Sequence, residues 1–301
     1  MLIPVDHGNR NIKTENFIFT SGLAISKMKP SMGNHLLYEG NYYSLSSTRT
    51  EYKKDKSVDN TFFILTLFAI ADEMLKENNG FSKNIILPVG LPPKFFGLYY
   101  KKFENYFLNR GKLEFEYKKQ VFNIEIVLVP VYPQAFAALF TKPEIINEHD
   151  KLVAIDIGGM TCDIVVYEDG QVRYDLSKSI ESGIIKEYHH INSIINSEFG
   201  IDLCENDIDK IFKNTSELKN ADLTNRVDSL FKTYTKELVG KISESIPLVT
   251  YKTALIGGTS RLLEKYLAMY VPNEPYFIGD IHANAKGYRI LFELEDSLGK
   301  Y

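Results

Sequence analysis

The sequence contains few of the residues that build disulfide-linked or metal-held frameworks. It has only two cysteines, Cys162 and Cys204, and no tryptophan. Two isolated cysteines provide neither a disulfide framework nor the repeated spacing of a metal site. No apolar run approaches the roughly 18 to 20 residues of a membrane-spanning helix, and the N-terminus lacks the pattern of a signal peptide. We therefore expect a cytoplasmic protein without membrane contact.

An excess of positive charge is also missing. The 35 Lys and Arg residues are outnumbered by 39 Asp and Glu residues, which gives a formal net charge of −4. Binding nucleic acid over a broad face needs clustered Lys and Arg that displace counterions from phosphates. We therefore expect no direct nucleic-acid partner. The 301 residues, of which 44% are hydrophobic and 25% charged, have the composition of a globular protein of two domain-sized units.

Two short apolar strands, about half a chain apart, each end in an aspartate followed by glycine. Asp6 precedes Gly8, and Asp156 precedes Gly158 and Gly159. Glycine lets a backbone approach an anion closely, and successive N–H groups of such a turn form an anion-binding nest. A single turn of this kind is as often an ordinary hairpin. The duplicated pair favours two phosphate-binding hairpins, one for each lobe of a nucleotide clamp.

The hairpin residues suggest how a nucleotide would be held. The carboxylates of Asp6 and Asp156 would bind Mg²⁺ largely through water, because this ion keeps most of its hydration shell and bridges carboxylates to phosphates. Lys13 would supply a positive charge for the β-phosphate. The other hairpin residues that would surround the anion are Gly8, Asn9, Asn11, Gly158, Gly159 and Thr161.

Gln134 follows a strand of the first half and begins a predicted helix over residues 133–140, with Pro133 in the first turn. A glutamine there would orient a water molecule in line with the γ-phosphate, since phosphoryl transfer depends mainly on positioning and charge. Taken alone, Gln134 is better explained as a solvent-exposed residue at a helix start, beside a packing face of small residues.

Gly257 and Gly258 end a buried strand and open a helix in the second half. The N–H groups of that helix start, together with Ser260, would contact the sugar and phosphates of a nucleotide. Gly183, Lys186 and Glu187 open a longer predicted helix. These three residues would either border the base or lie on a solvated helix face, and the sequence leaves both alternatives open.

Each half of the chain begins with a strand, an Asp-x-Gly turn and further strands before its helices, which indicates an internal duplication of pattern. In the first half we predict helices at 59–78, 94–109 and 133–140, strands at 84–89, 113–118 and 121–129, and short strands and loops over 28–56. In the second half we predict strands at 152–156, 163–168, 171–177 and 252–256 and helices at 181–199, 205–212, 221–245 and 284–296.

In this order, the features resemble the actin, sugar kinase and heat-shock chaperone ATPase superfamily. The resemblance is strongest to the bacterial actin-like ATPases of the ParM/StbA plasmid-segregation type. Residues 6–13, which end in Asn-Ile-Lys, resemble the first phosphate motif of that family, and residues 156–164 resemble the second. Gln134 lies at the family's first inter-lobe connection, residues 256–258 at its adenosine motif, and residues 284–287 at its second connection.

The resemblance implies an α/β protein with an actin-like fold, in which two duplicated ribonuclease H-like lobes have a nucleotide cleft between them. Domain I would comprise residues 1–150, with a small subdomain inserted at about 28–85 and with residues 281–301 packing back on it. Domain II would comprise residues 151–280. Asp6, Gln134 and Asp156 would be the catalytic residues.

The resemblance also implies a function. Such a protein binds Mg-ATP, or GTP, between its lobes, polymerises head to tail, hydrolyses the nucleotide after assembly, and moves plasmids through an adaptor protein bound to centromeric DNA. Two alternatives stay open. The chain could instead be a small-molecule kinase of the same superfamily, or an ATPase that never polymerises.

Overall fold

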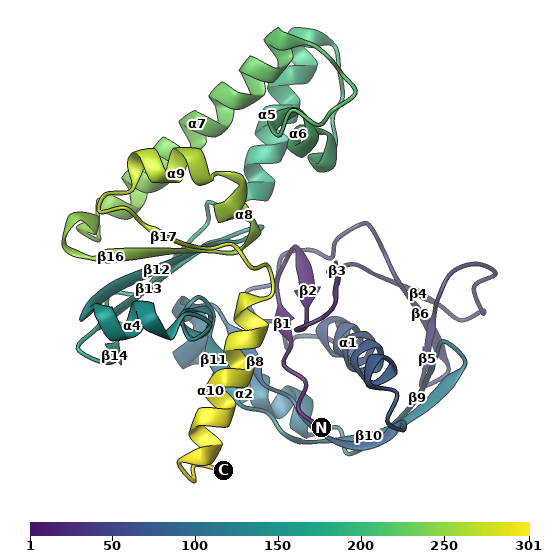
Figure 1. Ribbon diagram of the computed structural model, residues 1–301. Coiled ribbons are helices and arrows are strands. Elements are labelled where there is room, and N and C mark those ends of the chain that lie inside the picture. The colour runs from purple at the N-terminus through teal and green to yellow at the C-terminus, as the bar shows by residue number, and fades with distance from the viewer. The chain divides into compact units, whose positions relative to one another are not determined.

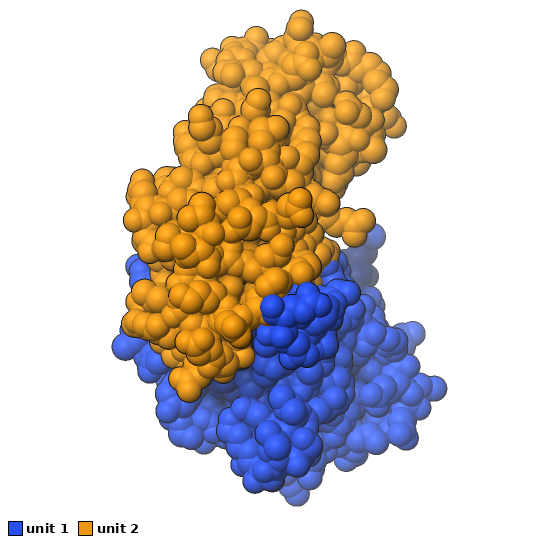
Figure 2. Space-filling model, turned by 60° about the vertical axis from the view of Figure 1, so that its left-hand side comes forward, with its two compact units in different colours: residues 1–148, 280–301 blue, residues 149–279 orange.

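The computed structural model describes residues 1–301 and consists of two compact units (Figures 1 and 2). Unit 1 contains residues 1–148 and 280–301, and unit 2 contains residues 149–279. Each unit combines β-sheet with helices packed against it (Figure 1). No helix is both long enough and apolar enough to cross a membrane.

The largest sheet of unit 1 has six strands in the order β4-β6-β5-β9-β10-β7. Its strands are Leu23–Ser26 (β4), Leu36–Tyr38 (β5), Asn41–Leu45 (β6), Ser82–Ile86 (β7), Lys112–Tyr117 (β9) and Gln120–Leu128 (β10). Helix α1 (Thr61–Glu77) lies against this sheet (Figure 1), where Phe68 contacts Tyr117 with ring centroids 5.2 Å apart. Residues Phe62 to Met74 of α1 are all buried, and most of them are apolar, as is typical of a core helix; Asp72 and Glu73 are the buried acidic residues among them.

Two small sheets of unit 1 position the first Asp-x-Gly turn. Strands Asp6–His7 (β1), Asn11–Lys13 (β2) and Ile18–Thr20 (β3) form an antiparallel sheet. Strands Val89–Leu91 (β8) and Val131–Pro133 (β11) pair in parallel, and Val5 pairs with Val89 through an isolated parallel bridge. The residue before Asp6 therefore lies beside β8, which in turn lies beside β11.

Four helices complete unit 1: α2 (Pro93–Leu108), α3 (Phe136–Leu139), α4 (Pro143–Glu148) and α10 (Ala283–Ser297). Helix α10 comes from the end of the chain and packs closely onto the elements around β11. A Cβ atom on Gly287 would lie only 1.9 Å from the backbone oxygen of Ala137 in α3. Similarly, a Cβ atom on Gly90 of β8 would lie 1.9 Å from the Tyr288 hydroxyl. Both contacts require glycine because a side chain would not fit.

Unit 2 is built around a second sheet, with strands in the order β14-β13-β12-β16-β17 and β15 paired to β13. Its strands are Lys151–Ile157 (β12), Cys162–Glu168 (β13), Gln171–Val172 (β14), Lys178–Ile180 (β15), Lys252–Ile256 (β16) and Tyr276–Ile278 (β17). The β12–β16 and β16–β17 pairs are parallel, and the others are antiparallel. The helices are α5 (Ile184–Phe199), α6 (Glu205–Phe212), α7 (Ala221–Ser243), η1 (Leu248–Thr250), α8 (Gly257–Leu262) and α9 (Glu264–Tyr270).

Local sequence explains where the long helices of unit 2 begin and end. The side chain of Asn220 caps α7 by accepting a hydrogen bond from the Leu223 N–H. Helix α5 ends at Gly200, whose φ of +70° suits glycine in the left-handed region. The predicted helix at 205–212 and the predicted strand at 252–256 match the observed α6 and β16.

Several predicted elements are wrong. Residues 133–140 do not form one helix, because Pro133 ends strand β11 and α3 begins only at Phe136. Ala135, with φ of +65°, interrupts the helical conformation between them. Of the predicted strand 171–177, only Gln171 and Val172 form a strand (β14), and the next strand, β15, begins at Lys178; both pair with β13. Strand β17 and helix α4 were not predicted.

Candidate functional site

In unit 1, parallel pairing brings Asp6 and Gln134 together although they are 128 residues apart in the chain. Val5, β8 and β11 lie side by side and run in the same direction, so the residues that follow them emerge at the same edge. The N–H group of Gln134 also donates to the carbonyl oxygen of Leu91 at the end of β8 (2.8 Å). Ligands of α/β proteins commonly bind at such carboxyl ends of parallel strands.

The Asp6 carboxylate is the centre of this cluster. The side-chain amide of Gln134 donates to Asp6 Oδ1 at 2.7 Å, and Lys13 Nζ donates to Asp6 Oδ2 at 3.3 Å. Asp6 is 2% exposed and Gln134 is 6% exposed, so both groups have lost nearly all contact with water. Three of the predicted site residues therefore meet in one buried hydrogen-bonded group.

A second lysine, Lys56, contributes to the electrostatics of the cluster. Burial alone would raise the pKa of the Asp6 carboxyl, but the charges of Lys13 and Lys56 and the Gln134 hydrogen bond outweigh it and hold the pKa below its ordinary value. Lys56 is itself 3% exposed, and its ammonium group donates to the backbone oxygen of His7. Lys56 could not be predicted as part of this cluster, because it ends a polar segment with no periodic pattern.

The side chain of His7 points into the core of unit 1. Its ring is fully buried and stacks on Phe107 with centroids 5.4 Å apart. The Thr66 hydroxyl donates to the Phe62 oxygen, so it accepts a hydrogen bond from His7 Nε2 at 2.7 Å. Burial, followed by the charge of Lys56, lowers the pKa of His7 to about 3. His7 is therefore a neutral core residue and not a phosphate ligand.

The turn after Asp6 has the tight geometry that the glycine suggested. A Cβ atom on Gly8 would lie 2.6 Å from the backbone oxygen of Asn11, which leaves no room for a side chain. Ser21 donates to the Gly8 oxygen at 2.5 Å and fixes the turn from the β3 side. Asn9 and Asn11 are partly exposed on either side of the bend.

In unit 2, Asp156 lies near the end of β12, opposite Asp163 on β13 and Ile256 on β16. The turn that follows is closed by a hydrogen bond from the Gly158 N–H to the Thr161 oxygen (2.8 Å). Asp156 is partly exposed, whereas Thr161 is 6% exposed and donates from its hydroxyl to Asp163 Oδ2 at 3.5 Å.

The start of helix α5 is joined to this turn. The N–H groups of Ile184 and Ile185 donate to the oxygens of Gly158 and Gly159 at 3.1 and 2.9 Å. A Cβ atom on Gly183 would lie 2.3 Å from the Gly159 oxygen, so only glycine allows the helix start to pack here. Gly183 is therefore a structural neighbour of the turn from Gly158 to Thr161.

Gly257 is adjacent to the same carboxylate. Its φ is +84°, and a Cβ atom there would lie 3.2 Å from Asp156 Oδ1. Gly258 follows it in the first turn of α8. Ser260 is fully buried and its hydroxyl donates to the Ile256 oxygen at 2.7 Å. This intrahelical bond gives Ser260 a role within α8, and its hydroxyl is not displayed on the surface.

Lys186 and Glu187, which the sequence analysis treated as one pair at the start of α5, lie in different environments. Lys186 is exposed and donates to the Glu181 oxygen at 3.2 Å, which places it on a solvated face. Glu187 is 9% exposed, and His190 Nδ1 lies 3.4 Å from its Oε2. Burial raises the pKa of Glu187 to about 7, although the neighbouring His190 acts in the opposite direction.

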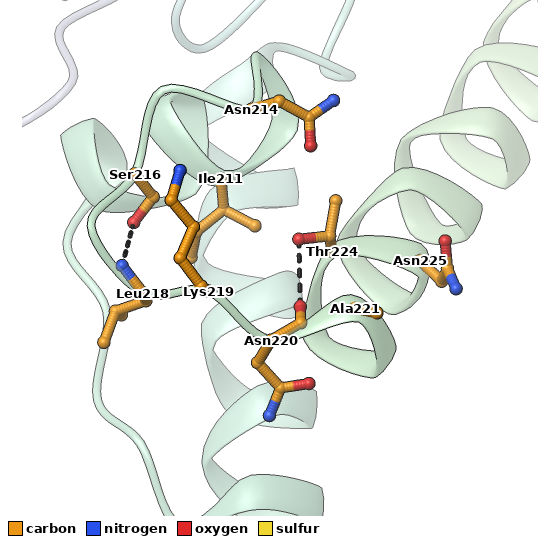
Figure 3. A pocket seen from close by; sticks show the side chains of 9 residues that line it. All are labelled: Ile211, Asn214, Ser216, Leu218, Lys219, Asn220, Ala221, Thr224 and Asn225. Atoms are coloured by element: carbon orange, nitrogen blue, oxygen red, sulfur yellow. Dashed lines mark hydrogen bonds between the residues drawn. The ribbon is translucent and has the colours of Figure 1, made fainter.

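Unit 2 also has a cavity of about 470 Å³ between the end of α6 and the start of α7 (Figure 3). It is lined mainly by short polar side chains such as Asn214, Ser216 and Asn225. Two hydrogen bonds on its wall are local ones, from the Leu218 N–H to Ser216 Oγ and from Thr224 Oγ1 to the Asn220 oxygen. None of the predicted site residues lines this cavity.

Comparison with known proteins identifies the fold. A family model described as the C-terminal part of the archaeal actin homologue MreB-like family matches residues 154–269. The archaeal actin homologue Ta0583 superimposes with a TM-score of 0.82 at 17% identity, over 97% of this chain and 99% of that chain. Its complex with ADP gives a TM-score of 0.77 at 16% identity, over 97% and 99% of the two chains.

A ParM subunit from a 15-stranded filament of Clostridium botulinum gives a TM-score of 0.75 at 18% identity, over 98% of this chain and 99% of that chain. A search of the curated proteins finds no match to the sequence. These comparisons confirm the predicted fold class: the chain is an α/β protein with an actin-like fold.

Substituting alanine for Gly183 should destabilise unit 2. The new Cβ atom would overlap the Gly159 backbone, and overpacking of this kind typically lowers the free energy of unfolding by about 1–3 kcal/mol. Gly240→Ala is the matched control, because a Cβ atom on Gly240 meets nothing within 4 Å. In the interior of α7 this control should be neutral or stabilising by up to about 1 kcal/mol. Chemical unfolding of both variants tests the contact, and an unchanged Gly183→Ala variant would contradict it.

Substituting Lys56→Met should lower the free energy of unfolding at pH 7 by about 1–3 kcal/mol, because the buried His7 oxygen loses its donor. Because the folded-state pKa of Asp6 is lowered, its ionisation stabilises the fold above the ordinary value of 3.8, and this contribution is lost as the pH falls through the lower folded-state pKa. The part of the destabilisation by Lys56→Met that arises from Asp6 should therefore become smaller as the pH falls below 3.8.

Lys29→Met, at an exposed position, is the matched control and should change the free energy of unfolding by less than about 0.5 kcal/mol. Urea unfolding of both variants at pH 7 and below pH 3.8 measures the two effects. A Lys56→Met variant as stable as Lys29→Met at neutral pH would remove Lys56 from the cluster.

Proposed function

We propose that this chain is a cytoplasmic, filament-forming ATPase of the ParM/StbA plasmid-segregation type. It would bind Mg-ATP, assemble head to tail, and hydrolyse ATP after assembly. The observation that carries the proposal is the buried cluster of Asp6, Lys13 and Gln134 at the carboxyl ends of parallel segments. In a chain with an actin-like fold, this cluster combines a carboxylate, a phosphate-binding cation and a water-orienting amide.

Each member of the cluster has a distinct proposed role. Lys13 would exchange its 3.3 Å contact with Asp6 for a contact with the β-phosphate. Gln134 would use its amide to orient the attacking water, and its hydrogen bond to Asp6 would fix the direction of that amide. Lys56, whose charge also lowers the pKa of Asp6, would still act on this carboxylate when Lys13 turns to the phosphate.

The residues fit a magnesium ion, but not equally. Asp6 is buried and both of its carboxylate oxygens already accept hydrogen bonds, from Gln134 and from Lys13. Asp156 is partly exposed and lies beside the Gly158 turn, which suits an ion bound through water. We therefore propose Asp156 as the main residue for an ion bound through water, with Asp6 as the second candidate. When bound there, Mg²⁺ would supply positive charge that offsets the negative charge of the phosphates.

Further residues in each unit are proposed to contact a nucleotide. Gly8, Asn9 and Asn11 of unit 1 would surround a phosphate, as would the turn from Gly158 to Thr161 in unit 2. Gly257 and Gly258 would approach the nucleotide through their backbones, since Gly257 already adjoins the Asp156 carboxylate. Glu187, rather than the exposed Lys186, is the better candidate for a contact with the base.

We assign unit 1 to actin-like domain I, in which the inserted subdomain at about 28–85 contains β5, β6 and α1, and unit 2 to domain II. Repeated head-to-tail contacts that do not close on themselves generate a filament. The similarity to a ParM from a 15-stranded filament supports self-assembly. An adaptor protein bound to centromeric DNA would link the filament to a plasmid, without direct contact between this chain and nucleic acid.

Light scattering of the purified protein tests the assembly step. With Mg-ATP, light scattering should rise sharply above a critical protein concentration, because filaments grow only when subunits add faster than they leave. Without nucleotide, scattering should stay low. A parallel series with Mg-GTP compares the two nucleotides. Flat scattering during steady ATP hydrolysis would favour a non-polymerising ATPase. ATP consumption that requires an added small-molecule acceptor would favour a kinase.

Gln134→Ala should slow ATP hydrolysis by about tenfold to a hundredfold, because the attacking water loses its orienting group. Nucleotide affinity and assembly should be unchanged, since Gln134 contacts no phosphate in this proposal. Phosphate release and scattering, measured on the same sample, separate the two effects. Gln120→Ala, at an exposed position on β10, is the matched control. Unchanged phosphate release by Gln134→Ala would remove Gln134 from its assigned role.

A further inference from the structure

The backbone that carries Gln134 has an unusual conformation. The Phe136 N–H donates to the Gln134 oxygen at 2.8 Å, which closes a three-residue γ-turn. The central residue, Ala135, has φ of +65° and ψ of −46°. This form of γ-turn is rare and strained, and Ala135 has a Cβ atom that makes the conformation still less favourable. Such a turn persists only where surrounding groups hold it.

One side chain stabilises this turn through a specific hydrogen bond. Asn284, in the first turn of α10, accepts a hydrogen bond from the Ala135 N–H through its Oδ1 at 3.0 Å. Ala135 is fully buried and Asn284 is 5% exposed, so water does not compete for this N–H group. The bond joins residues 149 positions apart in the chain.

Other contacts limit the freedom of the turn on both sides. The Gln134 N–H is bound to the Leu91 oxygen at 2.8 Å, which fixes the residue to β8. Downstream of the turn, Gly287 of α10 packs against the Ala137 oxygen, where no side chain would fit. Helix α10 therefore reaches the turn twice, through the Asn284 hydrogen bond and through the close approach at Gly287.

We propose that Asn284 is a positioning residue for Gln134. By holding the Ala135 N–H, it keeps the strained turn closed and thereby keeps the Gln134 amide on Asp6, 2.7 Å away. Without this acceptor, the backbone of Ala135 would relax toward an ordinary negative φ. The Gln134 side chain would then turn away from Asp6 and lose their hydrogen bond. The inference rests on the proposed function, because it assigns Asn284 an effect on hydrolysis through Gln134.

Three variants of the full chain test the proposal. Asn284→Leu keeps the approximate volume and removes the acceptor, whereas Asn284→Asp keeps an acceptor in the same place. Asn284→Leu combined with Ala135→Gly removes the acceptor and also relieves the strain, because glycine adopts a positive φ readily. Glu293→Gln, at an exposed position on the same helix, is the control.

The measurements are kcat for ATP hydrolysis and the affinity for Mg-ATP. Asn284→Leu should lower kcat by about tenfold or more while the affinity stays within about twofold, because only the water-orienting group is misplaced. Asn284→Asp should retain most of the wild-type kcat, and Ala135→Gly should restore much of it in the Asn284→Leu background. A wild-type kcat in Asn284→Leu, or no recovery in either of the other variants, would overturn the proposal.

A readout that does not depend on catalysis separates this inference from the proposed function. Amide hydrogen exchange at Ala135 should be faster in Asn284→Leu than in wild type, while exchange at Leu223 in unit 2 should be unchanged and so report intact folding. If wild type hydrolyses no ATP, the proposed function is lost. If amide exchange at Ala135 is also the same in Asn284→Leu as in wild type, the proposal that Asn284 stabilises the turn is lost as well. If wild type is active and Gln134→Ala is slow but Asn284→Leu is not, only the inference about Asn284 is lost.

Discussion

The buried carboxylate of Asp6 is the constraint on which the rest of the candidate site depends. A carboxylate that is 2% exposed is stable in its ionised form only if hydrogen bonds and positive charges replace the lost water. Lys13, Lys56 and the Gln134 amide supply these, and each comes from a different part of unit 1. The groups that stabilise this one charge therefore come from the first hairpin, the polar segment before α1 and the end of β11, which all meet at Asp6.

The C-terminal helix α10 of unit 1 contacts the segment that carries Gln134. The end of β11 must turn sharply to present Gln134 to Asp6, and that turn is held by Asn284 and by the close approach of Gly287. Residues from near both ends of the chain thus meet at Gln134. In unit 2 the corresponding arrangement is simpler, because Asp156, the Gly158 turn and Gly257 adjoin one another through parallel pairing of β12 and β16.

Much of the fold was predictable because its signals are local. Apolar periodicity and helix-ending residues predicted α1, α6 and α10 within a few residues, and the two Asp-x-Gly turns indicated the duplicated pattern. Gln134 was predicted to be a water-orienting residue at a helix start. The structure places it beside Asp6, between the end of β11 and the start of α3 rather than within a helix, and the sequence contained no signal for that contact. The positive φ of Ala135 depends on tertiary contacts, so it could not be predicted from the sequence. Lys56 and the inward direction of His7 were missed for the same reason, because burial of a polar side chain depends on partners far along the chain.

The most direct test of the account is a crystal structure of the protein with Mg²⁺ and a non-hydrolysable ATP analogue. In that structure we expect Lys13 Nζ to contact the β-phosphate and Asp6 and Gln134 to remain hydrogen-bonded. We also expect the Gln134 amide to contact a water molecule next to the γ-phosphate. Asp156 should contact water bound to the metal ion. A nucleotide whose phosphates lie away from Lys13 and Gln134 would contradict the central claim.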